Sequence, residues 1–310
     1  MFDSPTFLPI RAFGRGLLLC FFGALMQSAQ PLAAADAEGF SLRQVVVALK
    51  PDKNPDAMVA ERAELAAYLK QALGRPAEVI VPLSASVILE GLANGSVDLA
   101  YLSATDMVAA QARGIAELLL AGEIAGKTSY RSYWVTLKEK PYASIEELRD
   151  RPIAFASKTS TSGYVVPLWD LQQRGLLGPS GRPEAFFGKG NVWFGSGYVS
   201  GVERVLNGEA EAAAVSDYVM DKDKHLDAAQ RARLRVLATQ GPVPTHVIAV
   251  RSSLSAADRA VLKRALTGLD APAHEGLRDK VFTSKLVEVD PAKHLGGLRE
   301  ALELARKGAE

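Results

Sequence analysis

The chain has 310 residues, with 36 Lys and Arg side chains against 35 Asp and Glu, so its formal net charge is +1. A chain this close to neutral lacks the basic surface that attracts nucleic acids and anionic membranes. Its length is enough for two lobes, each with a core of its own.

The N-terminal segment has the pattern of a secretory signal peptide. Arg11 and Arg15 precede an apolar run at residues 17–26, and an Ala-x-Ala cleavage site follows at residues 33–35. The apolar run is too short for a permanent membrane-spanning helix. We therefore expect residues 1–35 to be removed on export, which makes the protein periplasmic.

The exported chain is expected to begin near Asp36 with a formal net charge of zero, because the signal takes away two arginines and one aspartate. Removal of the signal also takes away Cys20, the single cysteine of the chain. The exported chain is therefore expected to form no disulfide, no thiolate metal site and no cysteine nucleophile.

Beyond the signal, short apolar strands alternate with helices. The helix expected at residues 57–73 is typical: its apolar side chains recur on one face, and Gly74 stops it. Such alternation indicates an α/β protein with largely parallel sheets, in which ligands collect at the carboxyl ends of the strands. The other main elements are expected as strands at residues 44–49, 78–81, 97–102, 130–137, 152–156 and 242–250, and as helices at residues 86–93, from the mid-160s to 174, and 295–307.

Two segments of the chain, residues 92–103 and 205–216, align with each other without a gap. Each reads as a helix end with an Asn-Gly stop, then an acidic turn, then an apolar strand that finishes in polar residues. Two copies about half a chain apart indicate two similar lobes, each sending a strand end toward the cleft between them. The alternative is a chance match, since Asn-Gly helix stops are common.

The strands expected near residues 134 and 241 are candidates for crossings between lobes. They divide the exported chain into residues 36–133 of the first lobe, residues 134–240 as the second lobe, and residues 241–310 as a return to the first lobe. The final helix is expected to pack on the first lobe.

The segment K-T-S-T-S-G-Y-V-V-P, which begins at Lys158, points most directly to a ligand. It follows a predicted buried strand and leads into a helix, whose first N–H groups lack internal partners and whose dipole favours an anion. Ser160, Thr161 and Ser162 can donate hydroxyl hydrogen bonds, and Gly163 allows the backbone to approach a ligand. Lys158 could add positive charge, or it could be a solvated surface lysine. The alternative for the whole turn is an ordinary helix cap without a ligand.

This segment, the later L-N-G-E-A-E-A-A-A-V strand and the P-V-P-T-H-V-I-A-V crossing occur in an order that resembles a known family. They resemble the phosphate, phosphite and phosphonate-binding proteins of ABC transporters, the PhnD-like group of type II periplasmic binding proteins. The resemblance implies a two-lobed α/β clamp with two hinge crossover strands. It also implies that the hydroxyls of Ser160, Thr161 and Ser162 hold the oxygens of a small oxyanion.

The chain departs from this family at the other end of the expected pocket. Family members that bind aminoalkylphosphonates carry tyrosines where this chain has Ala85 and Leu102, and a histidine where it has Tyr198. They carry acidic residues where it has Tyr218 and His246. An aminoalkylphosphonate is therefore not the expected ligand.

Four residues at predicted strand or loop ends, Tyr101, Ser103, Tyr198 and Asp217, are candidate wall residues of the pocket, although Tyr101 fits a core position equally well. His246 would replace a carboxylate by a donor, which favours a ligand with a second anionic or acceptor end. A structural histidine at the hinge fits this position as well.

No arrangement of catalytic side chains is evident. The four histidines lack H-x-x-x-H spacing, Ser196 is not in a G-x-S-x-G elbow, and there is no Walker-type loop. We expect a binding protein without metal or cofactor, a monomer that captures a small phosphonate-, phosphite- or phosphate-like anion and delivers it to an ABC permease. The alternatives are a ligand-sensing subunit of a histidine kinase and a non-phosphorus anion such as a small carboxylate.

Overall fold

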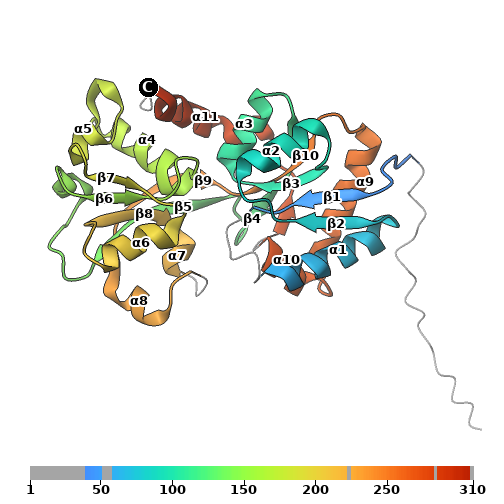
Figure 1. The fold of residues 1–310 in the computed structure, drawn as a ribbon, viewed down its shortest axis with the longest axis horizontal. Helices are drawn as coiled ribbons and strands as arrows, with labels where there is room; N and C mark the ends of the chain where they lie inside the picture. Colours follow the sequence, from blue (N-terminus) through green and yellow to red (C-terminus); the bar gives the residue numbers. More distant parts are fainter. Residues whose placement is uncertain (1–38, 51–57, 222–224, 283–284, 308–310) are drawn as a thin grey trace, which may run out of the picture. The chain divides into compact units, whose positions relative to one another are not determined.

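Strands and helices alternate along the chain, and the strands gather into two separate sheets (Figure 1). The computed structural model describes residues 39–50, 58–221, 225–282 and 285–307; the predicted signal peptide and its cleavage site lie outside these residues. Among the described residues, no helix combines the length and the apolar character needed to cross a membrane.

The first sheet has the strand order β11-β4-β10-β3-β1-β2. Its strands β1, β2 and β3 are parallel, whereas β10 runs antiparallel to both β3 and β4. Every side chain of β3 is buried, as expected for a strand with helices on both faces. The elements around this sheet are β1 (Val45–Ala48), α1 (Val59–Leu73), β2 (Ala77–Ile80), α2 (Ala85–Asn94), β3 (Leu99–Leu102), α3 (Ala104–Ala112), β4 (Ala116–Glu123), β10 (Val247–Arg251), α9 (Ala256–Thr267), η6 (Gly268–Asp270), α10 (Glu275–Val281) and β11 (Lys285–Val287).

The second sheet has the order β7-β6-β8-β5-β9, with parallel pairs on either side of β6 and antiparallel pairs on either side of β5. Its elements are β5 (Ser129–Leu137), η3 (Ile145–Leu148), β6 (Ile153–Phe155), the π-helical turn η4 (Thr161–Val165), α4 (Val166–Gln173), η5 (Gly178–Ser180), α5 (Glu184–Phe187), β7 (Val192–Phe194), α6 (Tyr198–Leu206), β8 (Ala212–Ser216), α7 (Asp217–Asp221), α8 (Ala228–Arg233) and β9 (Leu234–Pro244).

The prediction of largely parallel sheets is only partly correct. The strand β10 enters the first sheet at the edge where β3 ends, because Val247 pairs with Leu102. The strand β5 likewise enters the second sheet where β8 ends, because Ser132 pairs with Ser216. A strand that enters a sheet at the end of its neighbour, without a crossover helix to carry the chain back to the other edge, must run antiparallel to that neighbour.

The chain changes sheets at residues 124–128, between β4 and β5, and at residues 245–246, between β9 and β10. The predicted lobe boundaries, 133/134 and 240/241, fall inside β5 and β9. Thr245 ties the two crossings together: its hydroxyl donates to the carbonyls of Gly122 (2.6 Å) and Thr128 (3.0 Å), and its N–H donates to the Thr128 carbonyl (3.1 Å).

The two aligned segments adopt the same local structure. The helix α2 ends at Asn94 with Gly95 at a φ of 81°, and α6 ends at Leu206, two residues before Gly208 at a φ of 75°. Each segment then continues into a strand, β3 or β8, that runs parallel to a neighbour in its own sheet. The predicted helix stop and strand are therefore confirmed in both copies.

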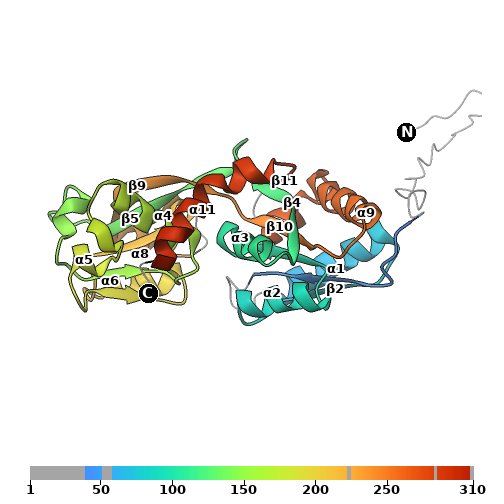
Figure 2. The same cartoon turned by 90° about the horizontal axis from the view of Figure 1, so that it is seen from above.

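The final helix α11 (Pro291–Lys307) contacts both halves of the molecule (Figure 2). It packs on α3 and also on α4, and its buried Leu295, Leu298 and Ala301 join one continuous apolar cluster with both. The prediction that this helix packs on the first lobe is therefore incomplete. Its apolar stripe is long enough to cover surface on both sides of the crossings.

Replacing Thr245 by Val should lower the free energy of unfolding by roughly 1–3 kcal/mol, because two backbone carbonyls lose a buried donor. Urea unfolding of the exported chain measures the change. Thr267→Val is the control, because the Thr267 hydroxyl donates only to carbonyls of its own helix. Its free energy of unfolding should change by no more than about 0.5 kcal/mol. Equal losses in the two variants would contradict a special role for Thr245.

Candidate functional site

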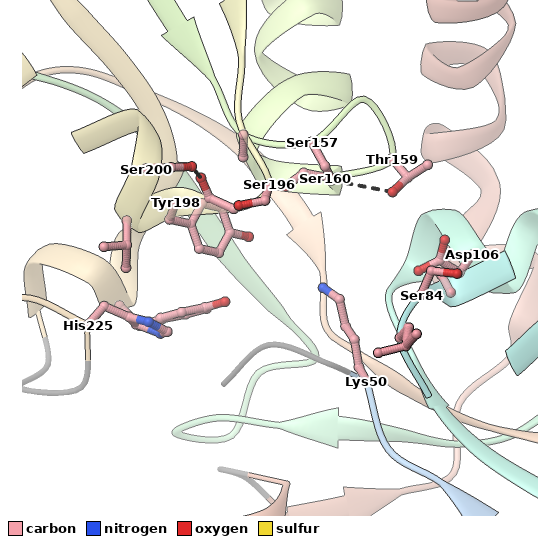
Figure 3. Close-up of a pocket in the computed structure, with 16 residues that line it drawn as sticks. Lys50, Ser84, Asp106, Ser157, Thr159, Ser160, Ser196, Tyr198, Ser200 and His225 are labelled. Atoms are coloured by element: carbon pink, nitrogen blue, oxygen red, sulfur yellow. Dashed lines mark hydrogen bonds between the residues drawn. The ribbon is translucent and has the colours of Figure 1, made fainter. Parts of the chain in front are cut away.

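A pocket of about 510 Å³ is lined by residues from around both sheets (Figure 3). Such a volume suits a small organic ligand with room for water. From the first sheet's side the lining residues are Lys50, Leu83, Ser84, Ala85 and Asp106; from the second sheet's side they are Ala156, Ser157, Thr159, Ser160, Ser196, Gly197, Tyr198, Val199, Ser200, Tyr218 and His225.

The pocket lies where α2, α3, η4 and α6 begin, because each of them follows a strand whose carboxyl end points to this region. Ser84 caps α2 by accepting the Val87 N–H (3.4 Å), and Ser160 caps η4 by accepting the Gly163 N–H (3.0 Å). Gly197 stands at the start of α6 in extended conformation. Helix N-termini carry partial positive charge, so their convergence favours an anion.

Two charged side chains share the pocket, Lys50 and Asp106. Lys50 is the second residue after the end of β1, and Figure 3 shows its ammonium group extending into the space between Asp106 and Tyr198. Asp106 is only 5% exposed and accepts the Ser103 hydroxyl on Oδ2 at 2.6 Å. Burial raises the pKa of Asp106, against the opposing effects of the Ser103 hydrogen bonds and the Lys50 charge.

The hydroxyls of the predicted Ser-Thr-Ser element point in different directions, as successive residues of a helical turn must. Ser160 lines the pocket. Thr161 is 3% exposed, and its hydroxyl lies 2.8 Å from that of Thr105 at the start of α3. Thr161 thus connects η4 to the first sheet's side instead of lining the pocket.

Ser162 is fully buried beneath two tyrosines. Its hydroxyl lies 2.7 Å from the Tyr198 hydroxyl and accepts that of Tyr130 at 3.2 Å, while its carbonyl accepts the Ser132 hydroxyl at 2.7 Å. Burial raises the pKa of Tyr130 well above its ordinary value, so its phenol remains a donor. Tyr198 therefore stands between Ser162 and the pocket.

Three aromatic side chains form one wall of the pocket. Ring centroids are 5.9 Å apart for Tyr198 and Tyr218, 5.3 Å for Tyr218 and His225, and 6.3 Å for Tyr198 and His225. Leu83, which is 92% exposed, and Val199, which is 37% exposed, add apolar surface from opposite sides. This part of the pocket suits an uncharged organic group.

Of the remaining predicted site residues, Tyr101 and His246 do not line this pocket. The Tyr101 hydroxyl donates to the Phe282 carbonyl at 2.9 Å, and its ring lies 5.3 Å from that of His246. Asp217 does not line it either, because its carboxylate accepts the backbone N–H groups of Arg131 and Tyr218, both at 2.8 Å.

Ser103 and Gly163 support the pocket from behind its lining. Ser103 caps α3 by accepting the Asp106 N–H at 3.1 Å and donates its hydroxyl to the same residue's carboxylate. Gly163 lies so close to Ala156 that a Cβ on it would be 2.5 Å from the Ala156 Cβ. Of the nine predicted site residues, only Ser160 and Tyr198 line the pocket directly.

The sequence analysis missed Lys50 and Asp106. Lys50 directly follows the first predicted strand, so the rule that ligands collect at strand ends could have identified it. Ser103 and Asp106 form the S-x-x-D spacing of a helix start, which gave a local signal but no indication of a pocket.

Lys158 instead holds its ammonium 5.1 Å from the centre of the Phe194 ring, outside this pocket. Within the part of the chain that the structure describes, no group of His, Cys, Asp and Glu could hold a metal ion.

Comparison with known proteins gives a consistent picture. The model of a family described as "ABC transporter, phosphonate, periplasmic substrate-binding protein" matches residues 47–294. A curated relative, the phosphate-import protein PhnD of Mycolicibacterium smegmatis, is 25% identical over 190 residues, which are 60% of this chain and 59% of that protein. The chain therefore spans less than two thirds of the length of that relative.

Two solved structures share the fold. XAC2383 from Xanthomonas citri, bound to ATP, has a TM-score of 0.73 and 20% identity, covering 87% of this chain and 100% of the other. PhnD1 from Prochlorococcus marinus, in complex with methylphosphonate, has a TM-score of 0.73 and 18% identity, covering 86% and 99%. The predicted type II periplasmic binding fold is confirmed.

Replacing Gly163 by Ala should destabilise the protein by roughly 1–3 kcal/mol, because the added methyl group would overlap Ala156 and the Ser160 hydroxyl. Thermal or urea unfolding tests this expectation. Gly276→Ala on α10 is the matched control, since nothing lies within 4 Å of the added Cβ and stability should stay level or rise slightly. Unchanged stability of Gly163→Ala would show that this turn is more loosely packed than described.

Proposed function

Because this chain belongs to the family of periplasmic substrate-binding proteins of phosphonate ABC transporters, we propose that it captures a small phosphorus oxyanion in the pocket between its two sheets. The bound anion is then delivered to a membrane permease. Export by the predicted signal peptide is part of this proposal, since the family acts in the periplasm.

The observation that carries the proposal is the convergence of helix starts, one lysine and several hydroxyls on a single pocket. Lys50 supplies a full positive charge, and the helix starts add partial positive charge around it. Ser160 accepts the Gly163 N–H through its oxygen, so its own hydrogen remains to be donated to a ligand. Hydroxyls of Ser157, Thr159 and Ser196 lie in the same lining.

We place the organic substituent of the ligand against the rings of Tyr198, Tyr218 and His225. Tyr218 stands where the aminoalkylphosphonate binders that this chain resembles carry an acidic residue, and the three rings offer an apolar face instead. An alkyl- or arylphosphonate therefore fits the pocket better than an aminoalkylphosphonate. Inorganic phosphate, which the name of the curated relative specifies for that protein, belongs to the same chemical class.

Ligand capture proceeds by closure about the two crossings at residues 124–128 and 245–246. Lys50 lies on the first sheet's side of the pocket and Ser160 on the second sheet's side. A ligand can contact both residues at once only when the two sides have closed around it. Those contacts shift the population toward the closed form, which the permease recognises. Thr245 keeps the crossings in register during this movement.

Replacing Lys50 by Met should weaken binding of methylphosphonate and inorganic phosphate at least about tenfold, because a hydrogen bond to a charged group contributes roughly 1.5–3 kcal/mol. Isothermal titration calorimetry on protein refolded to remove carried ligand measures the affinity. The matched control is Lys158→Met, whose ammonium lies over Phe194 outside the pocket, and its affinity should match the wild type.

The opposite pattern, with Lys158→Met weakened and Lys50→Met unchanged, would place the anion elsewhere. An absence of binding by the wild type to any phosphorus oxyanion would overturn the proposed function itself. A panel that includes small carboxylates would then identify the true class of ligand.

A further inference from the structure

A carboxyl group lies in a pocket that is otherwise built for an anion. Asp106 stands in the first turn of α3 and lines the pocket together with Lys50 and Ser84. Figure 3 shows it across from Tyr198, with the Lys50 ammonium between them. The side chain is 5% exposed, so bulk water does little to screen its charge.

The position of the carboxyl group is firmly set. The Ser103 hydroxyl donates to Asp106 Oδ2 at 2.6 Å, and the Asp106 N–H donates back to the Ser103 oxygen at 3.1 Å. This reciprocal pair fixes the side chain on the helix start. Asp106 therefore cannot turn away easily when an anion enters the pocket.

An ionised carboxylate and a fully ionised oxyanion repel each other at contact distance, and the low dielectric of a closed cleft strengthens that repulsion. A proton between the two groups converts repulsion into a hydrogen bond. The proton can reside on the carboxyl group or on an oxygen of the ligand. The Lys50 ammonium can balance one negative charge. When both the Asp106 carboxylate and the oxyanion are ionised, the second negative charge is left uncompensated.

Among the residues that the structure describes, the other titratable groups that line this space are Lys50, Tyr198, Tyr218 and His225. Burial of Asp106 raises its pKa, with Ser103 and Lys50 acting in the opposite direction. Several charged side chains near α3 are paired: Glu90 with Arg113, Asp98 with Arg251, Glu117 with Arg259, and Arg299 with Gln111.

We propose that Asp106 selects anions that carry a proton, by sharing one hydrogen between its carboxyl group and an oxygen of the bound anion. The inference rests on the proposed function and narrows it. Phosphonates and phosphate hold a proton near neutral pH, whereas sulfonates and sulfate are fully ionised there. The pocket therefore discriminates between oxyanions of the same shape by their protonation.

The test compares methylphosphonate with methanesulfonate, two ligands of nearly the same size, by calorimetry between about pH 5.5 and 7. The wild type should prefer methylphosphonate on the order of a hundredfold near pH 7, where methylphosphonate still carries a proton and methanesulfonate leaves the carboxylate facing an unprotonated oxygen. As the pH falls toward the raised pKa of Asp106, the carboxyl group gains its own proton and methanesulfonate should bind more tightly.

Asp106→Asn replaces the carboxyl group by an amide that can donate a hydrogen bond to either ligand at any pH, while its oxygen still accepts the Ser103 hydroxyl. Methanesulfonate affinity should rise at least about tenfold near pH 7, and it should no longer show the increase at lower pH that protonation of Asp106 causes in the wild type. His225 is present in both proteins, so its contribution cancels when the pH profile of the variant is subtracted from that of the wild type. Asp170→Asn is the matched control, because this half-buried aspartate of α4 pairs with Arg174 outside the pocket, and it should keep wild-type selectivity.

Equal affinity of the wild type for both ligands near pH 7 would overturn the inference and leave the proposed function intact. Unaltered selectivity in Asp106→Asn would overturn it as well. If the wild type bound neither ligand nor inorganic phosphate, the proposed function would fail and the inference with it. A melting temperature of Asp106→Asn near that of the wild type establishes that the variant is folded.

Discussion

In a sheet of parallel strands, the helix that follows each strand begins near the strand's carboxyl end, so the unpaired N–H groups of several helices meet along one edge. Here α2 and α3 on one side, and η4 and α6 on the other, begin at the same pocket. The positive ends of these helices favour an anion before any side chain is considered. The rest of the site modifies that basic preference.

The modifications serve three purposes. Lys50 adds a mobile full charge to the fixed partial charges of the backbone. The rings of Tyr198, Tyr218 and His225 shape the space beyond the anion, where an organic substituent has room. Asp106, held by Ser103, introduces a negative group, which we propose shares a proton with the bound anion. In the proposed function, attraction for anions is thus general, whereas selectivity arises from a few side chains.

The Ser-Thr-Ser element shows how far local reasoning reaches. A helix start with three hydroxyls was predicted, and η4 begins there with Ser160 as its cap. Local sequence could not reveal that Thr161 would bond Thr105, 56 positions away, or that Tyr198 and Tyr130 would cover Ser162. Tyr101 was assigned to the pocket from its strand end and His246 from the family's residues, yet the Tyr101 ring lies beside that of His246 and meets the Phe282 ring edge-on. The direction in which a side chain points depends on neighbours brought in by folding.

The sequence by itself determined the alternation of strands and helices, the helix stops at Gly74 and Gly95, the helix start at Ser160, and the kind of ligand to expect. These features depend on residues within one or two turns, and the chain records them directly. Only the tertiary structure decided that Lys50 and Asp106 share a pocket, that one hydroxyl of three faces it, and that α11 packs on both halves. These outcomes require distant segments to pack together, because the free energy of burying their apolar faces selects one arrangement that no short stretch of sequence contains.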